Sequence, residues 1–275
     1  DALGGDLVRD VRPGELVILH TDGEGFDSYR LYEEDNTAHC FFEHVYFARP
    51  DSKIDGRLVY DVRRDLGAKL WEEEGVETDV VLPVPDSGRA FASGYAEAAQ
   101  DDGAGVEFAE GLMKNRYVGR TFIMPTQDVR ERAVRLKLNP IRDVVEGKTV
   151  TVIDDSIVRG TTSRQLVELL RDVGAEEVNF RVGAPAIIAP CYMGIDMATR
   201  EELIAADRST EEIRDEVGAD SLSYLSIDAV AAALDASDVD LCLGCVTGEY
   251  PYDIDGEPTD RDVERPNIGT ALADD

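Results

Sequence analysis

Hydrophobic and polar positions in the middle of the chain alternate between strand-like runs and helical spacing. Four segments rich in apolar or β-branched residues predict strands, at 80–84, 106–112, 149–153 and 178–182, and the unbroken run at 149–153 is typical of a buried strand. Apolar residues at helical spacing predict helices at 54–74, 89–99 and 162–173. Strands and helices that alternate in this way form βαβ units, so the sequence predicts an α/β fold around a central parallel sheet.

The flanking segments differ from this pattern. Short strands are predicted before residue 50, at 15–20, 28–32 and 41–47. After Pro190 the pattern turns helical, at 199–207, 210–217 and 227–234. Beyond Tyr252 the content of Asp, Glu, Pro and Gly predicts a mobile tail. We therefore predict four segments, with boundaries at 1–50, 51–190, 191–252 and 253–275.

The charge of the chain narrows the classes of partner. Its 275 residues contain 28 Lys and Arg against 58 Asp and Glu, a net charge of −30. Such a surplus repels nucleic acid and anionic membranes, and no run of about 18 apolar residues is present. We expect a cytoplasmic protein that binds neither nucleic acid nor membrane. The acidic surplus resembles that of proteins from salt-in halophiles, in which salt screens self-repulsion.

The most informative segment is residues 149–163, which read TVTVIDDSIVRGTTS. Asp154 and Asp155 fall at the carboxyl end of a predicted strand, where ligands bind in open α/β sheets. The small and hydroxyl-bearing residues after them open a helix, and a helix N-terminus attracts phosphate. This order predicts a sugar-phosphate site. An ordinary capped connection would explain Ser163, but not two carboxylates followed by Arg-Gly-Thr-Thr.

Two further segments have competing interpretations. Ser87 lies within Val-Pro-Asp-Ser-Gly, and this segment by itself predicts only a turn. Beside the acidic segment 149–163, we favour contact with a pyrophosphate. The connection 114–141 is rich in Lys and Arg, unlike the rest of the chain. Charge runs are usually solvated surfaces, yet a long connection within a compact domain is often a lid over a ligand.

The four cysteines form a possible metal site. They are Cys40, Cys191, Cys242 and Cys245. The Cys-x-x-Cys spacing of the last two lets both thiolates reach one metal centre, and the remote pair completes a set of four. Zinc, an iron–sulfur cluster and four buried small hydrophobes all agree with the residues. His39 and His44 flank Cys40, and we interpret both as ordinary strand residues.

Together, the segment 149–163, the loop around Ser87 and the connection 114–141 resemble the amidophosphoribosyltransferase family, over nearly all of residues 7–252. The resemblance implies a type I phosphoribosyltransferase fold, in which the loop around Ser87, at 82–89, corresponds to the family's pyrophosphate loop and 114–141 to its flexible loop. This fold is preceded by the end of an N-terminal nucleophile glutaminase domain and followed by C-terminal helices. The chain starts at Asp1 without the family's nucleophilic Cys, so we interpret it as a fragment that carries the transferase half.

The activity that the resemblance implies is the first step of purine biosynthesis. Ammonia from glutamine replaces the pyrophosphate of phosphoribosyl pyrophosphate (PRPP) and yields 5-phosphoribosylamine. The implied assembly is a homotetramer. The implied catalytic residues are Asp154, Asp155, Lys114, Arg116 and Tyr117, and the implied PRPP-binding residues are Asp86, Ser87, Val158, Arg159, Gly160, Thr161, Thr162 and Ser163.

The resemblance also implies two cofactors. Ser87, Asp154 and Asp155 correspond to a magnesium site, which agrees with the preference of Mg²⁺ for a few oxygen ligands and substrate phosphates. A subset of the family carries a 4Fe-4S cluster, and all four of its cysteine positions are occupied here, by Cys40, Cys191, Cys242 and Cys245. The cluster would tie the N-terminal segment to the C-terminal helices.

Three alternatives stay open at this point. A PRPP-sensing regulator would carry a basic DNA-binding module, and the net charge of −30 speaks against it. A nucleobase phosphoribosyltransferase would need stacking and base-edge partners in its pocket. A metal-stapled interaction domain would not bind PRPP.

Overall fold

The computed structural model describes residues 4–21, 23, 25–31, 38–115, 138–195, 197, 199–236, 241–251 and 254. The chain divides into two compact units. The larger is Cys40–Tyr250, and the smaller combines Asp1–His39 with Pro251–Asp275.

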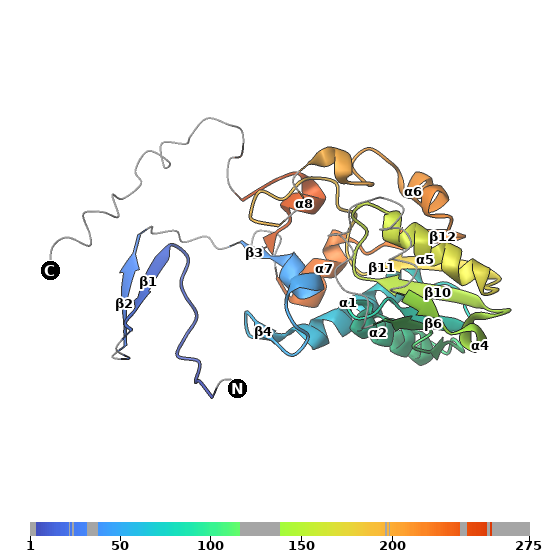
Figure 1. Cartoon of the computed structure of the whole chain (residues 1–275), viewed down its shortest axis with the longest axis horizontal. Helices are drawn as coiled ribbons and strands as arrows, with labels where there is room; N and C mark the ends of the chain where they lie inside the picture. Colours follow the sequence, from blue (N-terminus) through green and yellow to red (C-terminus); the bar gives the residue numbers. More distant parts are fainter. Residues whose placement is uncertain are drawn as a thin grey trace. The chain divides into compact units, whose positions relative to one another are not determined.

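A five-stranded parallel sheet forms the centre of the larger unit, in the order β12-β11-β10-β6-β7 (Figure 1). The strands are β6 (Val80–Pro83), β7 (Glu107–Phe108), β10 (Thr149–Asp154), β11 (Glu177–Val182) and β12 (Ser221–Tyr224). In the middle of the sheet, Val152 of β10 is in register with Leu82 of β6 and Phe180 of β11. The predicted α/β fold with a parallel sheet is therefore confirmed.

Helices cover both faces of this sheet, as Figure 1 shows. One apolar core lies between the sheet and α1 (Val59–Glu74), α2 (Gly88–Asp101) and α7 (Ile227–Leu234). A second core lies between the sheet and α5 (Thr161–Asp172) and α6 (Thr210–Val217). Adjacent strand residues belong to different cores, Val152 to the second and Ile153 to the first, because successive strand side chains point to opposite faces.

Helices α1 and α2 approach each other backbone to backbone. A Cβ added at Gly67 would lie 2.0 Å from the carbonyl oxygen of Phe91, and one at Gly94 would lie 1.9 Å from that of Arg64. No side chain larger than a hydrogen fits at either position. The two helices therefore form one tightly packed pair.

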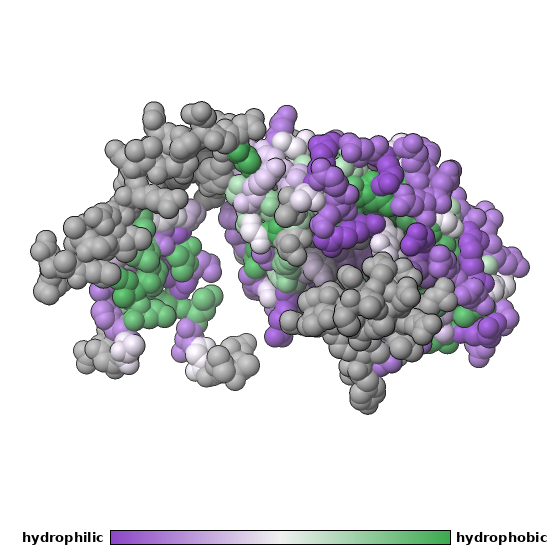
Figure 2. All heavy atoms as spheres, turned by 45° about the horizontal axis from the view of Figure 1, so that its top comes forward, coloured by the Kyte–Doolittle hydropathy of each residue, from purple (hydrophilic) through white to green (hydrophobic). Residues whose placement is uncertain are grey.

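The remaining helices and strands are short. In the larger unit they are β4 (Lys53–Ile54), β5 (Arg57–Leu58), β8 (Leu112–Lys114), β9 (Leu138–Pro140), α4 (Arg142–Val145), β13 (Leu241–Cys242), α8 (Gly244–Thr247), a π-helical turn η1 (Glu43–Phe47) and a 3₁₀ turn η3 (Arg200–Glu202). Strand β3 is His39–Cys40. In the smaller unit, β1 (Glu15–Leu19) and β2 (Phe26–Arg30) form an antiparallel hairpin that exposes Leu19, Phe26 and Tyr29. Figure 2 shows hydrophobic residues on the surface of this unit. No helix in the described part of the chain is long and apolar enough to span a membrane.

The strand predicted at 41–47 is wrong, because these residues form helical turns that end in η1. Phe41, Phe42 and Val45 are buried together, a spacing that suits one side of a helix. Their aromatic and β-branched composition favours a strand, but burial of this one side decides the backbone. His44 accordingly lies buried in a turn and not in a strand.

Other predicted boundaries also need correction. The strand predicted at 106–112 is two strands, since β7 leaves the sheet edge before β8 pairs with β9. Within 199–207 only η3 is helical, because the Ile204 amide donates to the Val158 carbonyl at 2.9 Å and not to its own preceding turn. Helix α1 starts at Val59, after the β4–β5 turn. Strand β12 was not predicted.

Candidate functional site

The two acidic residues lie at the carboxyl end of the central strand. Asp154 ends β10 and Asp155 follows it, and both side chains are buried. The Asp155 amide donates to Asp154 Oδ1 at 2.9 Å, and the Ser156 hydroxyl donates to Asp155 Oδ2 at 2.6 Å. Burial, and then the negative charge of Asp155, raise the pKa of Asp154 well above its usual range. The pair is therefore suited to hold a proton or a cation.

The N-terminus of α5 lies next to this acidic pair. Its first residue is Thr161, and no side chain in the described part of the chain caps it. The first amides of a helix lack helical partners and carry partial positive charge, so they bind anions such as phosphate. An anion site thus directly follows the carboxylates.

Gly160 is required where the loop enters α5. Its φ of +72° is in the left-handed region, and a Cβ there would lie 2.4 Å from Ile204 Cδ1. A hydrogen bond from the Ile204 amide to the Val158 carbonyl, at 2.9 Å, connects the same loop to segment 203–206. Segment 203–206 therefore fixes the shape of the predicted phosphate loop.

One cavity of about 470 Å³ joins the acidic pair and the helix N-terminus. This volume is in the range of small-molecule sites. The lining residues are Phe42, Tyr46, Phe47, Asp154, Asp155, Ser156, Ile157, Val158, Arg159, Gly160, Thr161, Thr162, Ser163, Ile195 and Met197. The structure thus brings together eight of the predicted site residues, from Asp154 to Ser163 without Ser156 and Ile157.

The loop around Ser87 lies against the end of β10 without lining this cavity. A Cβ added at Gly88 would lie 2.4 Å from the Ile153 carbonyl oxygen. The peptide bond between Pro85 and Asp86 is cis. Asp86 pairs with Lys114 Nζ at 2.8 Å and with Arg89 Nη1 at 3.0 Å. The structure therefore brings Lys114 to the predicted pyrophosphate loop.

The remaining predicted residues have mixed outcomes. Arg159 lines the cavity, and its guanidinium pairs with Glu202 at 2.7 Å. Arg116 and Tyr117 lie outside the described residues, as do residues 116–137 in general and the tail from 255 onward. Their predicted roles stay predictions.

Sequence reasoning missed the aromatic side of the cavity. Phe42, Tyr46 and Phe47 line it from the helical turns that were predicted as a strand. Arg63 of α1 was also missed, and it donates from Nε to the His44 carbonyl at 2.7 Å. The apolar spacing at 41, 42 and 45 was the available signal for the turn. Nothing in the sequence pattern marked Arg63.

The four cysteines gather in one region and none is in a disulfide. Burial, then the charges of Cys40, Cys191 and Cys242, raise the pKa of Cys245 to about 12. Burial is also the main cause that raises the pKa of Cys40, to which Cys242 adds. Among the described residues, no three Cys, His, Asp or Glu side chains are arranged to hold a metal ion. The thiols are thus close enough to interact electrostatically without forming such a group.

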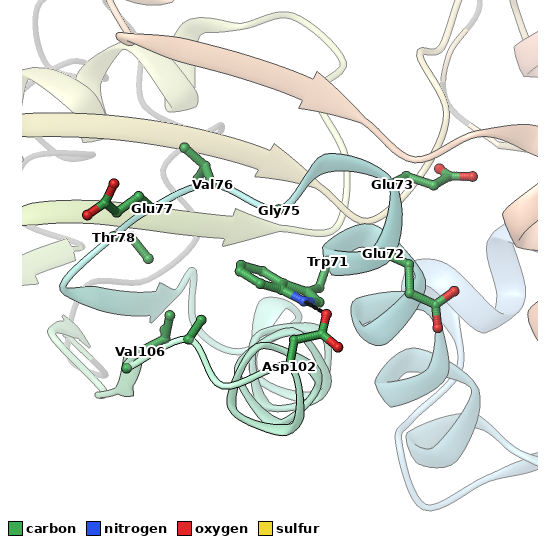
Figure 3. Close-up of a pocket in the computed structure, with 11 residues that line it drawn as sticks. Trp71, Glu72, Glu73, Gly75, Val76, Glu77, Thr78, Asp102 and Val106 are labelled. Atoms are coloured by element: carbon green, nitrogen blue, oxygen red, sulfur yellow. Dashed lines mark hydrogen bonds between the residues drawn. The ribbon is translucent and has the colours of Figure 1, made fainter.

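A second cavity of about 580 Å³ lies beside the amino ends of β6 and β7, whereas the acidic pair follows the carboxyl end of β10. Figure 3 shows the residues that line this second cavity. In it the indole nitrogen of Trp71 donates to Asp102 at 2.7 Å, with Glu72, Glu73 and Glu77 around the rim. It contains none of the predicted site residues. The carboxyl edge therefore remains the candidate site.

Comparisons with known proteins place the chain in a family. A family model described as a phosphoribosyl transferase domain matches residues 55–186, which include the acidic pair and the phosphate loop. An amidophosphoribosyltransferase of Methanothermobacter thermautotrophicus is 51% identical over 96% of this chain and 54% of its own length. One from Bacillus subtilis is 49% identical over 92% of this chain and 53% of its own length.

A solved structure gives the same result. The glutamine PRPP amidotransferase from B. subtilis, complexed with ADP and GMP, matches with a TM-score of 0.80 and 48% identity, over 94% of this chain and 56% of that chain. The chain spans about half the length of the curated relatives that it matches.

Proposed function

The chain belongs with the amidophosphoribosyltransferases and carries their phosphoribosyltransferase domain, and on this premise we propose that it binds PRPP and transfers ammonia to C1 of its ribose. The products are 5-phosphoribosylamine and pyrophosphate. In the intact protein the ammonia would come from glutamine. This activity would place the protein at the first step of purine biosynthesis.

The observation that carries the proposal is the shared cavity of the acidic pair and the free N-terminus of α5. PRPP has the matching chemistry, because it combines ribose hydroxyls, a 5-phosphate and a pyrophosphate on C1. The amides and hydroxyls of 158–163 suit the 5-phosphate, and Asp154 and Asp155 suit the hydroxyls or a cation between them and the pyrophosphate.

A magnesium ion agrees with the acidic pair. Two buried carboxylates lie side by side, and burial, followed by the negative charge of Asp155, raises the pKa of Asp154, an electrostatic cost that a bound cation would relieve. Oxygen ligands suit Mg²⁺, and two protein carboxylates suffice because this ion keeps waters and substrate phosphates as its other ligands. Ser87, at the start of α2, would be the third protein oxygen. Bound Mg²⁺ would supply charge neutralisation for the departing pyrophosphate.

The residues of the chain would divide the remaining work. Breaking the bond at C1 builds positive charge on the ribose ring, which the carboxylates of Asp154 and Asp155 stabilise. Lys114, held at the pyrophosphate loop by Asp86, would bring positive charge to the leaving group, together with Arg116 and Tyr117. Ammonia is a neutral nucleophile, so positioning serves it better than a strong base would.

The cysteine set would hold a 4Fe-4S cluster. Four thiols from three segments of the chain lie in one region, which provides the complete donor set that such a cluster requires. A cluster is larger than a single ion, so its ligands need not converge as closely as those of zinc. When bound, it would cross-link these segments. Iron and sulfide analysis with an absorption spectrum distinguishes it from zinc.

Replacement of Asp154 tests the transferase assignment. Asp154→Asn keeps the shape and the acceptor for the Asp155 amide but removes the negative charge that Asp154 would carry with a cation bound. We therefore expect ammonia-dependent amination to fall at least about 100-fold, as for a lost transition-state electrostatic partner. The matched control is Asp79→Asn, at the opposite end of β10, where Asp79 accepts from the Thr149 amide. Equal activity of both variants would contradict the proposed function.

A further inference from the structure

Arg63 is a buried cation that does not line the cavity at the acidic pair. It lies on α1 among Val62 and Leu66, and only 2% of its surface is exposed. In the described part of the chain no carboxylate lies within ion-pair distance of it. Burial lowers the pKa of Arg63, and the negative charge of Asp155 partly opposes that shift. A buried guanidinium is expensive unless its donors are satisfied, so its hydrogen bonds indicate its purpose.

Those hydrogen bonds go to the aromatic turn. Nε of Arg63 donates to the His44 carbonyl at 2.7 Å, and Nη2 donates to the Ala48 carbonyl at 2.9 Å. Carbonyls at the end of a helical segment lack partners within it, and a planar guanidinium can satisfy two at once. Arg63 therefore holds both ends of η1 to α1.

The turn buries His44 and Val45, but the two rings that it presents to the cavity are not buried. Tyr46 is 52% exposed and Phe47 is 44% exposed, and both line the cavity beside Asp155. The Phe47 ring packs on the buried Phe42 ring, with 5.7 Å between centroids, and the Tyr46 ring packs on Phe47 at 5.5 Å. Because both rings stay about half exposed, the backbone of η1 also determines where they lie. The backbone of η1 is fixed where Arg63 binds it.

Helix α1 is a firm base for this contact. Its backbone packs directly against that of α2 at Gly67 and Gly94. Helix α2 in turn starts directly after Ser87. One helix pair therefore carries both the aromatic turn and the predicted pyrophosphate loop. Arg63 is the link from this pair to the turn.

We propose that Arg63 is a positioning residue, which fixes Tyr46 and Phe47 beside Asp155 so that the cavity keeps water from C1 of the bound sugar. The inference rests on the proposed function. With the turn loosened, water replaces ammonia as nucleophile. Its oxygen bonds to C1, the C1–oxygen bond to pyrophosphate breaks with its electron pair on pyrophosphate, a proton is released, and ribose 5-phosphate forms instead of the amine.

The test compares three variants of the intact protein. Arg63→Met removes both hydrogen bonds at similar volume, Arg63→Lys keeps the charge but not the fork, and Arg64→Met is the control on the neighbouring residue, whose side chain pairs with Glu97 on α2. Release of pyrophosphate and formation of phosphoribosylamine are measured in parallel. For Arg63→Met we expect the ratio of pyrophosphate to amine to rise at least about threefold and kcat for amination to fall at least about tenfold. Arg63→Lys should lie between, and Arg64→Met should match the wild type.

Hydrogen–deuterium exchange reports on the turn itself. In Arg63→Lys we expect exchange at 43–48 to accelerate at least about fivefold, with no change at 161–172 in α5. Unchanged exchange at 43–48, or a product ratio equal to that of Arg64→Met, would overturn the role of Arg63. Binding of PRPP by the wild type is measured alongside, and its absence would instead contradict the proposed function. If Arg63→Met does not fold, the Arg63→Lys results decide.

Discussion

Substitution of Gly160 by alanine tests the packing of the phosphate loop most sharply. The backbone at Gly160 has a φ of +72°, and alanine in the left-handed region costs about 1–2 kcal/mol. The new Cβ would also lie 2.4 Å from Ile204 Cδ1, and overpacking of this kind costs about 1–3 kcal/mol. We therefore expect Gly160→Ala to lower the free energy of unfolding by about 2–5 kcal/mol, a large part of a typical total of about 5–15 kcal/mol.

Gly147→Ala is the matched control for the backbone contribution. Gly147 has nearly the same φ, +71°, but a Cβ there would meet no atom within 4 Å. Its loss should be only the left-handed penalty of about 1–2 kcal/mol. Urea unfolding of both variants, followed by circular dichroism, gives the difference, which is the contribution of Ile204.

A double variant isolates that contact further. Ile204→Val removes the Cδ1 atom, so Gly160→Ala should be less destabilising in its presence, with a coupling of about 1–3 kcal/mol. PRPP affinity should fall at least about tenfold in Gly160→Ala and stay unchanged in Gly147→Ala, because only the first displaces the N-terminus of α5. Equal destabilisation by the two alanines, together with no coupling to Ile204, would refute the reasoning.

Three other predictions concern charge. Because the pKa of Asp154 is raised in the folded protein, its contribution to stability is full below the pKa of the unfolded chain and is lost as pH rises through the folded pKa. In EDTA, the free energy of unfolding of Asp154→Asn should therefore exceed that of the wild type by an amount that grows from pH 4 upward. A difference that is independent of pH would contradict this. Because the pKa of Cys245 is raised to about 12, its alkylation at pH 7 in metal-free folded protein should be at least about 100-fold slower than in protein unfolded in urea. Mass spectrometry measures both rates, and equal rates would mean that the thiol is not buried. With a net charge of −30 and mostly exposed ion pairs, each worth only about 0–1 kcal/mol, both stability and activity should rise between 0.1 M and 2 M KCl, and optimal behaviour in dilute buffer would reject the halophilic interpretation.

The sequence predicted the part of the fold in which apolar runs are long. The run 149–153 became β10, with Asp154 as its last residue, and the helix expected from 162 starts one residue earlier. Both depend on local pattern, since a buried central strand is apolar on both faces and the following helix is amphipathic. The acidic pair and the start of the following helix were therefore placed together from the sequence, and in the structure they line one cavity, while the phosphate-binding role of the loop stays a prediction.

The elements that failed depend on distant partners. Strand β12 has one buried apolar residue, Leu222, between two serines, so its sequence has little strand pattern. Its extended backbone depends on pairing with β11. The turn at 43–47 is stabilised by burial of Phe41, Phe42 and Val45 in the core and by hydrogen bonds from Arg63, which is many residues away. Segment 203–206 is irregular because it packs over Gly160 and Val158. No local pattern encodes such contacts.

The central claim is that the cavity at the end of β10 binds PRPP through its acidic pair. Isothermal titration calorimetry of the intact protein with PRPP, with and without Mg²⁺, measures this directly. We predict saturable binding with one PRPP per chain that requires Mg²⁺ and weakens at least about tenfold in Asp154→Asn but not in Asp79→Asn. A well-folded protein that takes up no PRPP with Mg²⁺ present, or that binds it equally well in both variants, would contradict the account.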